Sequence, residues 1–590
     1  MSSRTRRSTT AQRRTRRTVF RMRTALLAIA FVLSLFAARL FQLQGLDANA
    51  YAAMAEAEGT RHVTLHAARG EILDRNGNEL ASSVDAVAIT ADPTMTADDA
   101  TRIAAILADT LDLDYFAAVE KLRTPDTQFV YLARRVPTWR ADELFTRLRS
   151  AELAGVFSER DPLRTYPESW AVSNLVGTVG RDGDGSSGFE AQYNDILRGT
   201  DGEATYVNSP GGEQIPMAGS SVVPAVDGQD IVTTLDRELQ FFASQRLAQQ
   251  CRLTGAEWGA AITIDVLTGE VFQFAQYPTF DPSRTEELEV ADTTNRGVQF
   301  VYEPGSVQKL FTFSALADQG VVTPRTRLRV PGALRVDGFE LNDFWEHGTL
   351  RLTAAGAIAK SSNIATIRAS RRITEEQLGS YLTAFGLGQE TGIGLPGESS
   401  GILADPSTWT DAQAATISFG QGLSVTALQM AAGVSAIANG GEYIAPTLVS
   451  GFGQPDGSVQ PAEQPESRRV VSEKAARMVA TMMTAVTQEG GTAEAAAIHG
   501  YRVAGKTGTA QRASGDGGYA AGERTISFAG FAPADNPRFM TYVVLDNPTK
   551  GDFGGGTGAA PVFHDIMSMV LQRYGVAPTG RRATRTPLEW

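Results

Sequence analysis

The sequence predicts an α+β protein with three successive parts. These are a single N-terminal transmembrane helix, an elongated α/β domain, and a larger domain with an antiparallel sheet flanked by helices and joined to a helical lobe. Three observations predict this. An apolar run follows an arginine-rich start, a stretch rich in Gly, Ser and Pro covers 199–228, and strand-like segments stand at both ends of the last part, with helical patterns between them.

The first 43 residues combine a basic tail with an apolar segment. Residues 1–23 hold nine arginines and no acid, although the formal charge of the whole chain is −12. Residues 24–43 provide the roughly 20 apolar positions that a membrane span requires, if Arg39 extends its charge toward the interface. The positive-inside rule then predicts 1–23 as a cytoplasmic tail, 24–43 as a single-pass anchor in the cell membrane, and the rest as extracytoplasmic.

A cleaved signal peptide is the alternative for this segment, because Ala48-Asn49-Ala50 resembles a cleavage site. The uninterrupted continuation of the apolar helix through Leu40-Phe41-Gln42-Leu43 favours the uncleaved anchor. A basic tail on an acidic body argues against nucleic acid as a partner and leaves the lipid bilayer as the partner of this region.

We predict that residues 44–225 form the α/β domain, which we call the pedestal. Asn76-Gly77 is a strong tight-turn signal, and strand-like residues follow from Val84 to Ile89. Helical patterns near 97–123 and 141–154 complete the domain before the flexible boundary at 199–228.

We predict that residues 226–575 form the larger domain. A helix from Asp236 to Gln250 precedes a hairpin of two strand-like segments, 260–265 and 270–274. Helical patterns dominate 306–440 and 472–489, and strands return around 501–511, 525–532 and 539–546. We expect the first and last strands to meet in one antiparallel sheet, and residues 576–590 to form a flexible tail.

The use of lysine directs attention to a few positions. Of the 54 basic residues only six are lysine, and a lysine can give up its proton where an arginine cannot. Cys251 is the single cysteine and the five histidines are scattered, so the sequence predicts no disulfide and no metal or organic cofactor.

Ser306 and Lys309 form the first candidate chemical site. Pro304-Gly305 ends the preceding segment, and an apolar-periodic helix runs from Ser306 to about Asp318. Ser306 therefore lies in the first helical turn, where free N–H groups favour negative charge, and Lys309 lies on the same face three residues later. A serine beside an amine that can be desolvated is an activated nucleophile. The alternative for this common spacing is a serine N-cap with a solvated lysine.

Two further motifs favour the catalytic interpretation. Ser361-Ser362-Asn363 follows Lys360, and Lys506-Thr507-Gly508-Thr509 lies on a probable strand whose glycines let a substrate backbone come close. Each motif alone is typical of an ordinary turn or loop. Together they place three of the six lysines in or beside three motifs, S-x-x-K, S-x-N and K-T-G.

On these motifs the chain resembles the penicillin-binding transpeptidases, specifically the monofunctional class B. The resemblance runs from the anchor to about residue 575, and three pedestal stretches add to it: Arg69-Gly70 with Asp74 to Gly77, Arg164 to Pro167, and Gly188-Phe189-Glu190. It implies a serine DD-peptidase/β-lactamase-like transpeptidase domain at 226–575 and a dimerisation-type pedestal at 44–225. The stretches 401–409, 419–423 and 528–533 look most like the cell-division (septal) branch.

The resemblance also implies roles for the motif residues. Ser306 would attack the carbonyl between the two terminal D-alanines of a peptidoglycan stem peptide, and Lys309 would take its proton. Ser361 and Lys506 would pass a proton to the departing D-alanine, and Asn363 would hold the peptide amide. Thr507, Gly508 and Thr509 would bind the substrate, with the N–H groups of Ser306 and Thr509 as the oxyanion hole.

The implied partners are peptidoglycan stem peptides, β-lactams that acylate Ser306, and a membrane-embedded glycan polymerase with other division proteins. Four alternatives stay open from sequence: an elongation-specific transpeptidase, a carboxypeptidase or β-lactamase with the same motifs, a β-lactam sensor, and a division scaffold with little turnover. The acceptor amine and the type of cross-link are not specified by the sequence.

Overall fold

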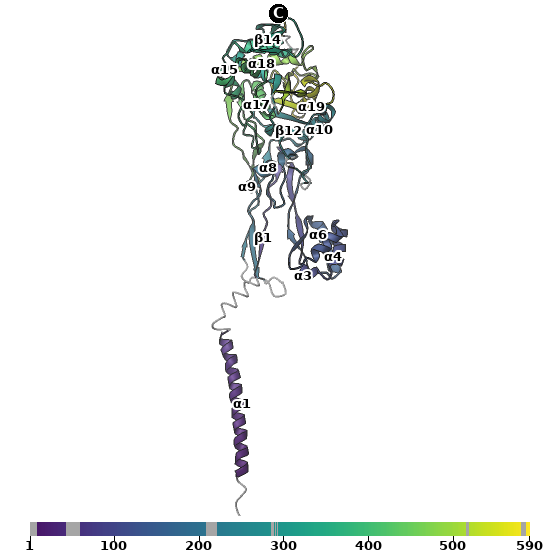
Figure 1. The fold of residues 1–590 in the computed structure, drawn as a ribbon, viewed down its shortest axis with the longest axis vertical. Helices are drawn as coiled ribbons and strands as arrows, with labels where there is room; N and C mark the ends of the chain where they lie inside the picture. The colour runs from purple at the N-terminus through teal and green to yellow at the C-terminus, as the bar shows by residue number, and fades with distance from the viewer. Residues whose placement is uncertain are drawn as a thin grey trace, which may run out of the picture. The chain divides into compact units, whose positions relative to one another are not determined.

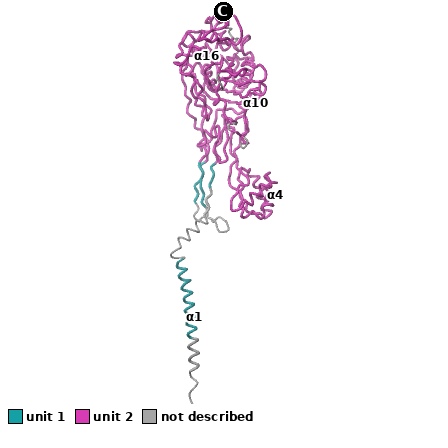
Figure 2. The backbone as a smooth tube through the Cα atoms, viewed as in Figure 1, with its two compact units in different colours: residues 1–67, 200–226 teal, residues 68–199, 227–590 magenta. Residues whose placement is uncertain are grey.

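The structure is a computed structural model that describes residues 9–42, 60–207, 221–284, 288–289, 291, 293–514, 518–579 and 586–590. The chain divides into two compact units (Figure 2). Unit 1 holds residues 1–67 and 200–226, and unit 2 holds residues 68–199 and 227–590.

Unit 1 contains the N-terminal helix and a small sheet. Helix α1 (Thr9–Phe41) includes the segment Val19–Phe41, which is long and apolar enough to cross a membrane and whose side chains are exposed. The three-stranded antiparallel sheet has the order β1-β8-β9, formed by β1 (Thr60–Leu65), β8 (Gly202–Val207) and β9 (Ser221–Val223). The predicted cleavage-site alternative at 48–50 lies outside the described residues.

A small α/β layer of unit 2 forms part of the pedestal. Strand β4 (Ala86–Ala91) lies between β5 (Val130–Pro137) and β6 (Val156–Arg160), both antiparallel to it. Helices α4 (Ala100–Leu111), α5 (Tyr115–Leu122) and α6 (Thr138–Ser150) share a separate apolar core with this sheet, as predicted for 97–123 and 141–154. The strand-like Val84 to Ile89 is divided between β4 and the preceding β3 (Glu79–Val84).

A second sheet of unit 2 joins segments from both sides of the predicted domain boundary. Its order is β19-β18-β10-β2-β3-β7. Its strands are β2 (Ile72–Leu73), β3, β7 (Leu163–Thr165), β10 (Ile231–Thr233), β18 (Val449–Gly453) and β19 (Val459–Pro461). The predicted turn at Asn76-Gly77 connects β2 to β3, where Gly77 has φ +82°. The Asp74 carboxylate accepts the N–H groups of Asn76 and Asn78, each at 2.8 Å.

A five-stranded sheet with long strands, which we call the large sheet, carries the predicted hairpin and the last three strands. Its order is β12-β11-β23-β22-β21, and every neighbouring pair is antiparallel. The strands are β11 (Trp258–Asp265), β12 (Val271–Tyr277), β21 (Ala504–Ala513), β22 (Tyr519–Ala532) and β23 (Phe539–Asp546). Since β11 pairs with β23, the expectation that the first and last strands meet is confirmed.

Every residue of β11 and β23 is buried, because helices cover both faces of this sheet. Helices α10 (Arg237–Thr254) and α19 (Ala560–Arg573) pack against each other and the sheet, and α17 (Ala427–Ala438), buried along its whole length, packs on β11, β22 and β23 (Figure 1). The predicted helix at 236–250 is α10, with Asp236 as its N-cap.

The helical lobe surrounds α12 (Lys309–Asp318). This helix packs against α14 (Asn363–Ser370), α15 (Glu375–Ala384), α16 (Asp411–Phe419), α17 and α18 (Glu473–Met483). Phe311 of α12 stacks on Phe385 with ring centroids 4.7 Å apart. The remaining elements are shorter: α3 (Pro93–Thr96), α7 (Ser173–Val176), α8 (Gly188–Gln192), α9 (Asn194–Leu197), α11 (Arg296–Gln299), α13 (Ala354–Ala359), β13 (Arg327–Val330), β14 (Ala333–Val336), β15 (Phe339–Asn342), β16 (Leu350–Thr353), β17 (Glu442–Ile444) and β20 (Ser467–Arg469).

The end of the chain pairs with β16. The N–H of Thr353 donates to the carbonyl of Leu588 at 2.9 Å, and the N–H of Trp590 donates to Arg351 at 3.1 Å. The sequence places these residues in a flexible tail, whereas the structure gives 586–590 backbone hydrogen bonds to a strand edge.

Candidate active site

Ser306 stands in the tight turn that leads into α12. Residues Gly305–Gln308 form a 3₁₀ turn (η4), and the α-helix proper begins at Lys309. The sequence predicted an α-helix from Ser306. In a 3₁₀ turn residues i and i+3 eclipse, which aligns Ser306 with Lys309 more directly than an α-helix would. The Lys309 Nζ lies 3.0 Å from the Ser306 Oγ.

A glycine lets this turn approach the edge of the large sheet. Gly305 has φ +55°, and a Cβ there would lie 2.7 Å from the carbonyl oxygen of Thr509 on β21. Its N–H donates to the carbonyl of Gly420 at 3.0 Å. A side chain at 305 would therefore push the nucleophile away from the K-T-G strand.

The S-x-N motif lies between two helices. Ser361 follows α13 with φ +59°, a conformation that non-glycine residues adopt only where the surroundings enforce it. Ser362 is the N-cap of α14, whose first residue is Asn363. The Ser361 Oγ lies 3.3 Å from the Lys309 Nζ and 2.9 Å from the Lys506 Nζ. The motif thus bridges the two lysines.

Lys309 has the environment of a neutral amine. Its side chain is fully buried, and its Nζ lies 2.6 Å from the Ser361 carbonyl and 2.7 Å from the Asn363 Oδ1. A neutral amine can donate to these two acceptors and turn its lone pair toward the Ser306 hydroxyl. Burial lowers the pKa of Lys309 to about 7, against the charge of Asp343, which raises it.

Lys506 is the second buried amine. It projects from β21 and donates to the Thr507 carbonyl at 2.8 Å and to the Ser361 Oγ at 2.9 Å. Burial, followed by the nearby amine of Lys309, lowers its pKa well below that of a solvated lysine. Burial therefore makes both amines easier to deprotonate than a solvated lysine, and for Lys309 it brings the pKa to about 7.

The K-T-G strand forms one wall of an open cleft. Strand β21 is the last strand of its sheet, so within the described part of the chain one of its edges pairs with no other strand, as an edge that can bind an extended peptide does. The Thr507 Oγ1 lies 3.0 Å from the Thr492 Oγ1, while Gly508 stands so close to Ser527 that a Cβ would lie 2.1 Å from its Oγ. The cleft has a volume of about 800 Å³, and its lining includes Ser306, Ser361, Asn363, Thr507 and Thr509.

The structure thus brings all eight predicted site residues together. Lys360 also lines the cleft, where its Nζ donates to the Gly490 carbonyl at 3.1 Å. Sequence reasoning missed Thr492 and Asp343, which lie in no motif and reach the site only through the fold. Among the residues that the structure describes, no group of three or more His, Cys, Asp or Glu is arranged to hold a metal ion.

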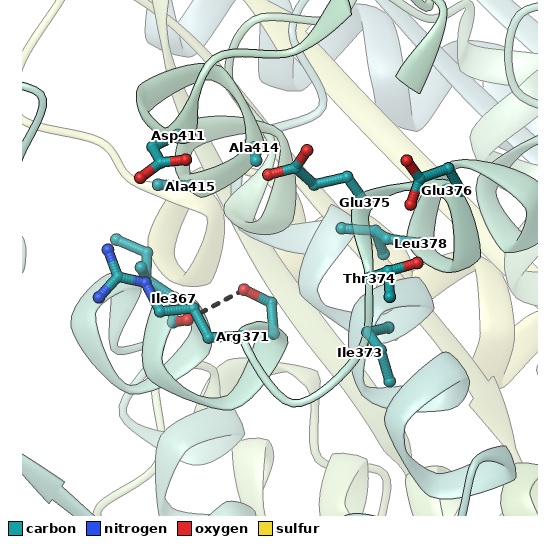
Figure 3. Close-up of a pocket in the computed structure, with 11 residues that line it drawn as sticks. Ile367, Arg371, Ile373, Thr374, Glu375, Glu376, Leu378, Asp411, Ala414 and Ala415 are labelled. Carbon is teal, nitrogen blue, oxygen red and sulfur yellow. Dashed lines mark hydrogen bonds between the residues drawn. The ribbon is translucent and has the colours of Figure 1, made fainter. Parts of the chain in front are cut away.

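A separate cavity of about 440 Å³ lies where α14, α15 and α16 come together (Figure 3). Glu375, Glu376, Asp411 and Arg371 surround its apolar floor. Its lining includes none of the eight predicted residues, and we assign it no role.

Comparison with known proteins matches two family descriptions to this chain. Residues 259–568 match the penicillin binding protein transpeptidase domain, and residues 64–233 match the penicillin-binding protein dimerisation domain.

Characterised relatives match over nearly the whole length. Penicillin-binding protein PbpB of Mycolicibacterium smegmatis is 37% identical, with 95% of this chain and 91% of that protein covered. Peptidoglycan D,D-transpeptidase FtsI of Escherichia coli is 33% identical, with 94% of this chain and 91% of that protein covered. The crystal structure of penicillin binding protein 3 from Mycobacterium tuberculosis, complexed with aztreonam, has a TM-score of 0.71 and 33% identity, and covers 89% of this chain and 100% of that one.

Proposed function

Since this chain belongs to the class B penicillin-binding proteins, we propose the residue roles through which it acts as a serine-type peptidoglycan D,D-transpeptidase. It cross-links peptidoglycan and binds β-lactams. The observation that supports the roles best is the buried Lys309 amine, 3.0 Å from the Ser306 hydroxyl and with a pKa lowered to about 7.

In the acylation step the Ser306 Oγ attacks the carbonyl between the two terminal D-alanines of a stem peptide. Lys309 accepts the hydroxyl proton, because a neutral amine beside a serine activates it as a nucleophile. The N–H groups of Ser306 and Thr509 stabilise the oxyanion, and loss of one such donor typically lowers the rate about 10²–10³-fold.

Departure of D-alanine requires a proton on the leaving nitrogen. Ser361 is placed to supply it, because its Oγ lies within 3.3 Å of Lys309 and 2.9 Å of Lys506. The proton that Lys309 took from Ser306 then passes back to the Ser361 Oγ, to which Lys506 is also hydrogen-bonded, so that the two lysines and one hydroxyl form a single path.

The substrate lies along β21 in this proposal. Asn363 holds the peptide amide from one side of the cleft, while Thr507 and Thr509 bind the terminal carboxylate beside Lys506. Gly508 leaves the backbone accessible. An amine from a neighbouring stem peptide then attacks the acyl-enzyme and forms the cross-link, whereas a β-lactam leaves Ser306 acylated.

The setting we propose is the septum. Residues 24–43 anchor the chain in the cell membrane, 1–23 face the cytoplasm, 44–225 form the pedestal and 226–575 the transpeptidase domain. The similarity to FtsI and PbpB supports division over elongation. Partners of the anchor and pedestal are a membrane-embedded glycan polymerase and other division proteins. Depletion followed by microscopy separates the two branches: filaments support the septal role, and rounded cells contradict it.

Fluorescent penicillin labelling of the full chain tests the enzymatic proposal. We expect stoichiometric labelling of the wild type, an adduct on Ser306 by mass spectrometry, and no label on Ser306→Ala. Ser380→Ala, which changes an exposed serine of α15, is the matched control and should label normally. Equal labelling of wild type and Ser306→Ala would refute the assignment, and rapid loss of the label would indicate a β-lactamase.

A further inference from the structure

A buried carboxylate lies behind the S-x-N motif, outside the three motifs themselves. The Asp343 side chain is fully buried in the loop after β15. Its Oδ2 accepts the Ser362 hydroxyl at 2.7 Å, and its Oδ1 accepts the N–H of Ile364 at 3.0 Å. Asp343 is therefore hydrogen-bonded to both the N-cap and the first turn of α14, the helix that begins with Asn363.

His347 closes the other side of this carboxylate. Its Nε2 lies 2.9 Å from the Asp343 Oδ2 and its Nδ1 lies 2.5 Å from the carbonyl oxygen of Gly348. The side chain is only 5% exposed. Trp345 covers the imidazole, with ring centroids 5.5 Å apart.

The hydrogen-bond partners limit where the protons of this pair can lie. Both ring nitrogens of His347 face oxygen acceptors, so both must carry protons unless Asp343 is protonated. The Ser362 Oγ accepts the N–H of Ala365 at 3.0 Å, which leaves its hydroxyl proton to donate to Asp343. The Ser362 hydroxyl and the N–H of Ile364 donate to the carboxylate, and the imidazole of His347 lies within hydrogen-bond distance of it.

We propose that Asp343 and His347 are positioning residues of the transpeptidase, a buried ion pair that holds Ser361, Ser362 and Asn363 against Lys309 and sets the local charge near that amine. The inference rests on the proposed role of Lys309 as the base. Neither residue touches the reacting atoms, since both act through the S-x-N segment and through the field at Lys309.

The two members of the pair act on Lys309 with opposite sign. The charge of Asp343 raises the pKa of Lys309, while burial lowers it. In the proposed ion pair, the positive charge of a protonated His347 offsets part of the Asp343 charge. The titratable groups that bear on this balance are Asp343, His347, Lys309 and, beyond Lys309, Lys506.

Two near-isosteric variants separate these effects. Asp343→Asn removes the negative charge and keeps an acceptor for Ile364, and a neutral His347 can then accept from the new amide. His347→Gln keeps a donor for Asp343 but removes the positive charge. Because only neutral Lys309 can take the proton of Ser306, acylation rises with pH through the pKa of Lys309. We expect the midpoint to move to lower pH in Asp343→Asn and to higher pH in His347→Gln.

The experiment measures the second-order rate of acylation by a fluorescent penicillin between pH 5.5 and 9, on the full-length chain in detergent. For Asp343→Asn we also expect a plateau about 10–100-fold lower, since misplaced catalytic groups commonly lose this much. Thermal unfolding shows whether each variant is folded. The acylation rate is calculated only for the fraction of molecules that becomes labelled.

Opposite shifts of the two midpoints support the inference. Unchanged midpoints, or shifts in the same direction, overturn it, even if both plateaus fall. If Asp343→Asn does not fold, the direction in which the pH midpoint of acylation shifts in His347→Gln decides whether the inference holds. Failure of the wild type to acylate at Ser306 would instead refute the proposed function, so the two failures are distinguishable.

Discussion

Two clusters of buried ionisable groups in unit 2, one in the pedestal and one in the active site, differ in how their groups are paired. In the pedestal, Glu190 is fully buried, and its Oε2 and Oε1 accept the Nε of Arg69 and the Nε of Arg164, each at 2.7 Å. In the active site, Lys309 and Lys506 are fully buried against hydroxyl, carbonyl and amide oxygens, and among the described residues no carboxylate is hydrogen-bonded to either amine.

The difference shows how one fold obtains both an inert and a reactive charge cluster. A buried carboxylate that contacts two arginines ties segments together, as Glu190 of α8 contacts Arg164 of β7 and Arg69. A buried amine without a carboxylate in contact has its pKa lowered and becomes a base. We therefore interpret the first arrangement as structural and the second as the one that supports the proposed catalytic role of Lys309.

The largest effect expected from this comparison is on acylation. Lys309→Arg places a permanently protonated side chain at this position, which cannot serve as a base, so the rate of Ser306 acylation should fall by at least ~10³-fold. Lys474→Arg, which changes an exposed lysine of α18, is the control and should label at the wild-type rate. Stopped-flow or gel labelling with fluorescent penicillin measures both, and near-normal acylation by Lys309→Arg would remove Lys309 from the mechanism.

The next effect is on stability and lies in the pedestal. Glu190→Gln leaves Arg69 and Arg164 without their buried partner, so the free energy of unfolding should fall by about 3–5 kcal/mol. Glu442→Gln, which removes the exposed pair with Arg469, should lower it by at most ~1 kcal/mol. Thermal unfolding of the full chain compares the two.

We also expect folded Glu190→Gln protein to be acylated at the wild-type rate, when the rate is calculated for the molecules that become labelled. A large loss of rate in folded protein would mean that the pedestal cluster contributes to the reactive site.

A smaller effect of opposite sign is expected when the reactive charge is removed. The folded pKa of Lys309 is lowered to about 7 from 10.5, so between these values the unfolded chain binds a proton that the folded chain does not. The free energy of unfolding of the wild type should therefore rise with pH across this window. Lys309→Met removes this penalty, and we expect about 1–3 kcal/mol of added stability at pH 7 that shrinks toward pH 10.

Thermal unfolding of wild type and Lys309→Met from pH 7 to pH 10 measures that difference, with Lys474→Met as the exposed control. A stabilisation that does not vary with pH would attribute the gain to side-chain packing instead of to the ionisation of Lys309.

Much of this organisation could be predicted from the sequence, because it depends on local patterns. The strand periodicity at 260–274 and 501–546 predicted the sheet, and the i, i+3 spacing of Ser306 and Lys309 predicted their contact. The 3₁₀ turn was not predicted, since it depends on Gly305 meeting Thr509 across the fold.

Contacts between residues far apart in the sequence could not be predicted from local patterns. Asp343 precedes Ser362 in the sequence without any motif, and only the return of the chain after β15 brings its carboxylate to the N-cap of α14. Likewise, the sequence marked Arg69, Arg164 and Glu190 as separate motifs, but nothing in their spacing indicated that the three would form one buried cluster.

The most direct test of the account is the titration of Lys309 itself. The chain has only six lysines, so selective ¹³C labelling gives few signals, and Lys309→Met identifies the one that disappears. We predict that this signal, in the full chain with Ser306 unmodified, titrates with a midpoint near pH 7. A Lys309 amine that stays protonated to pH 9 would contradict the claim that burial without a contacting carboxylate makes it the base.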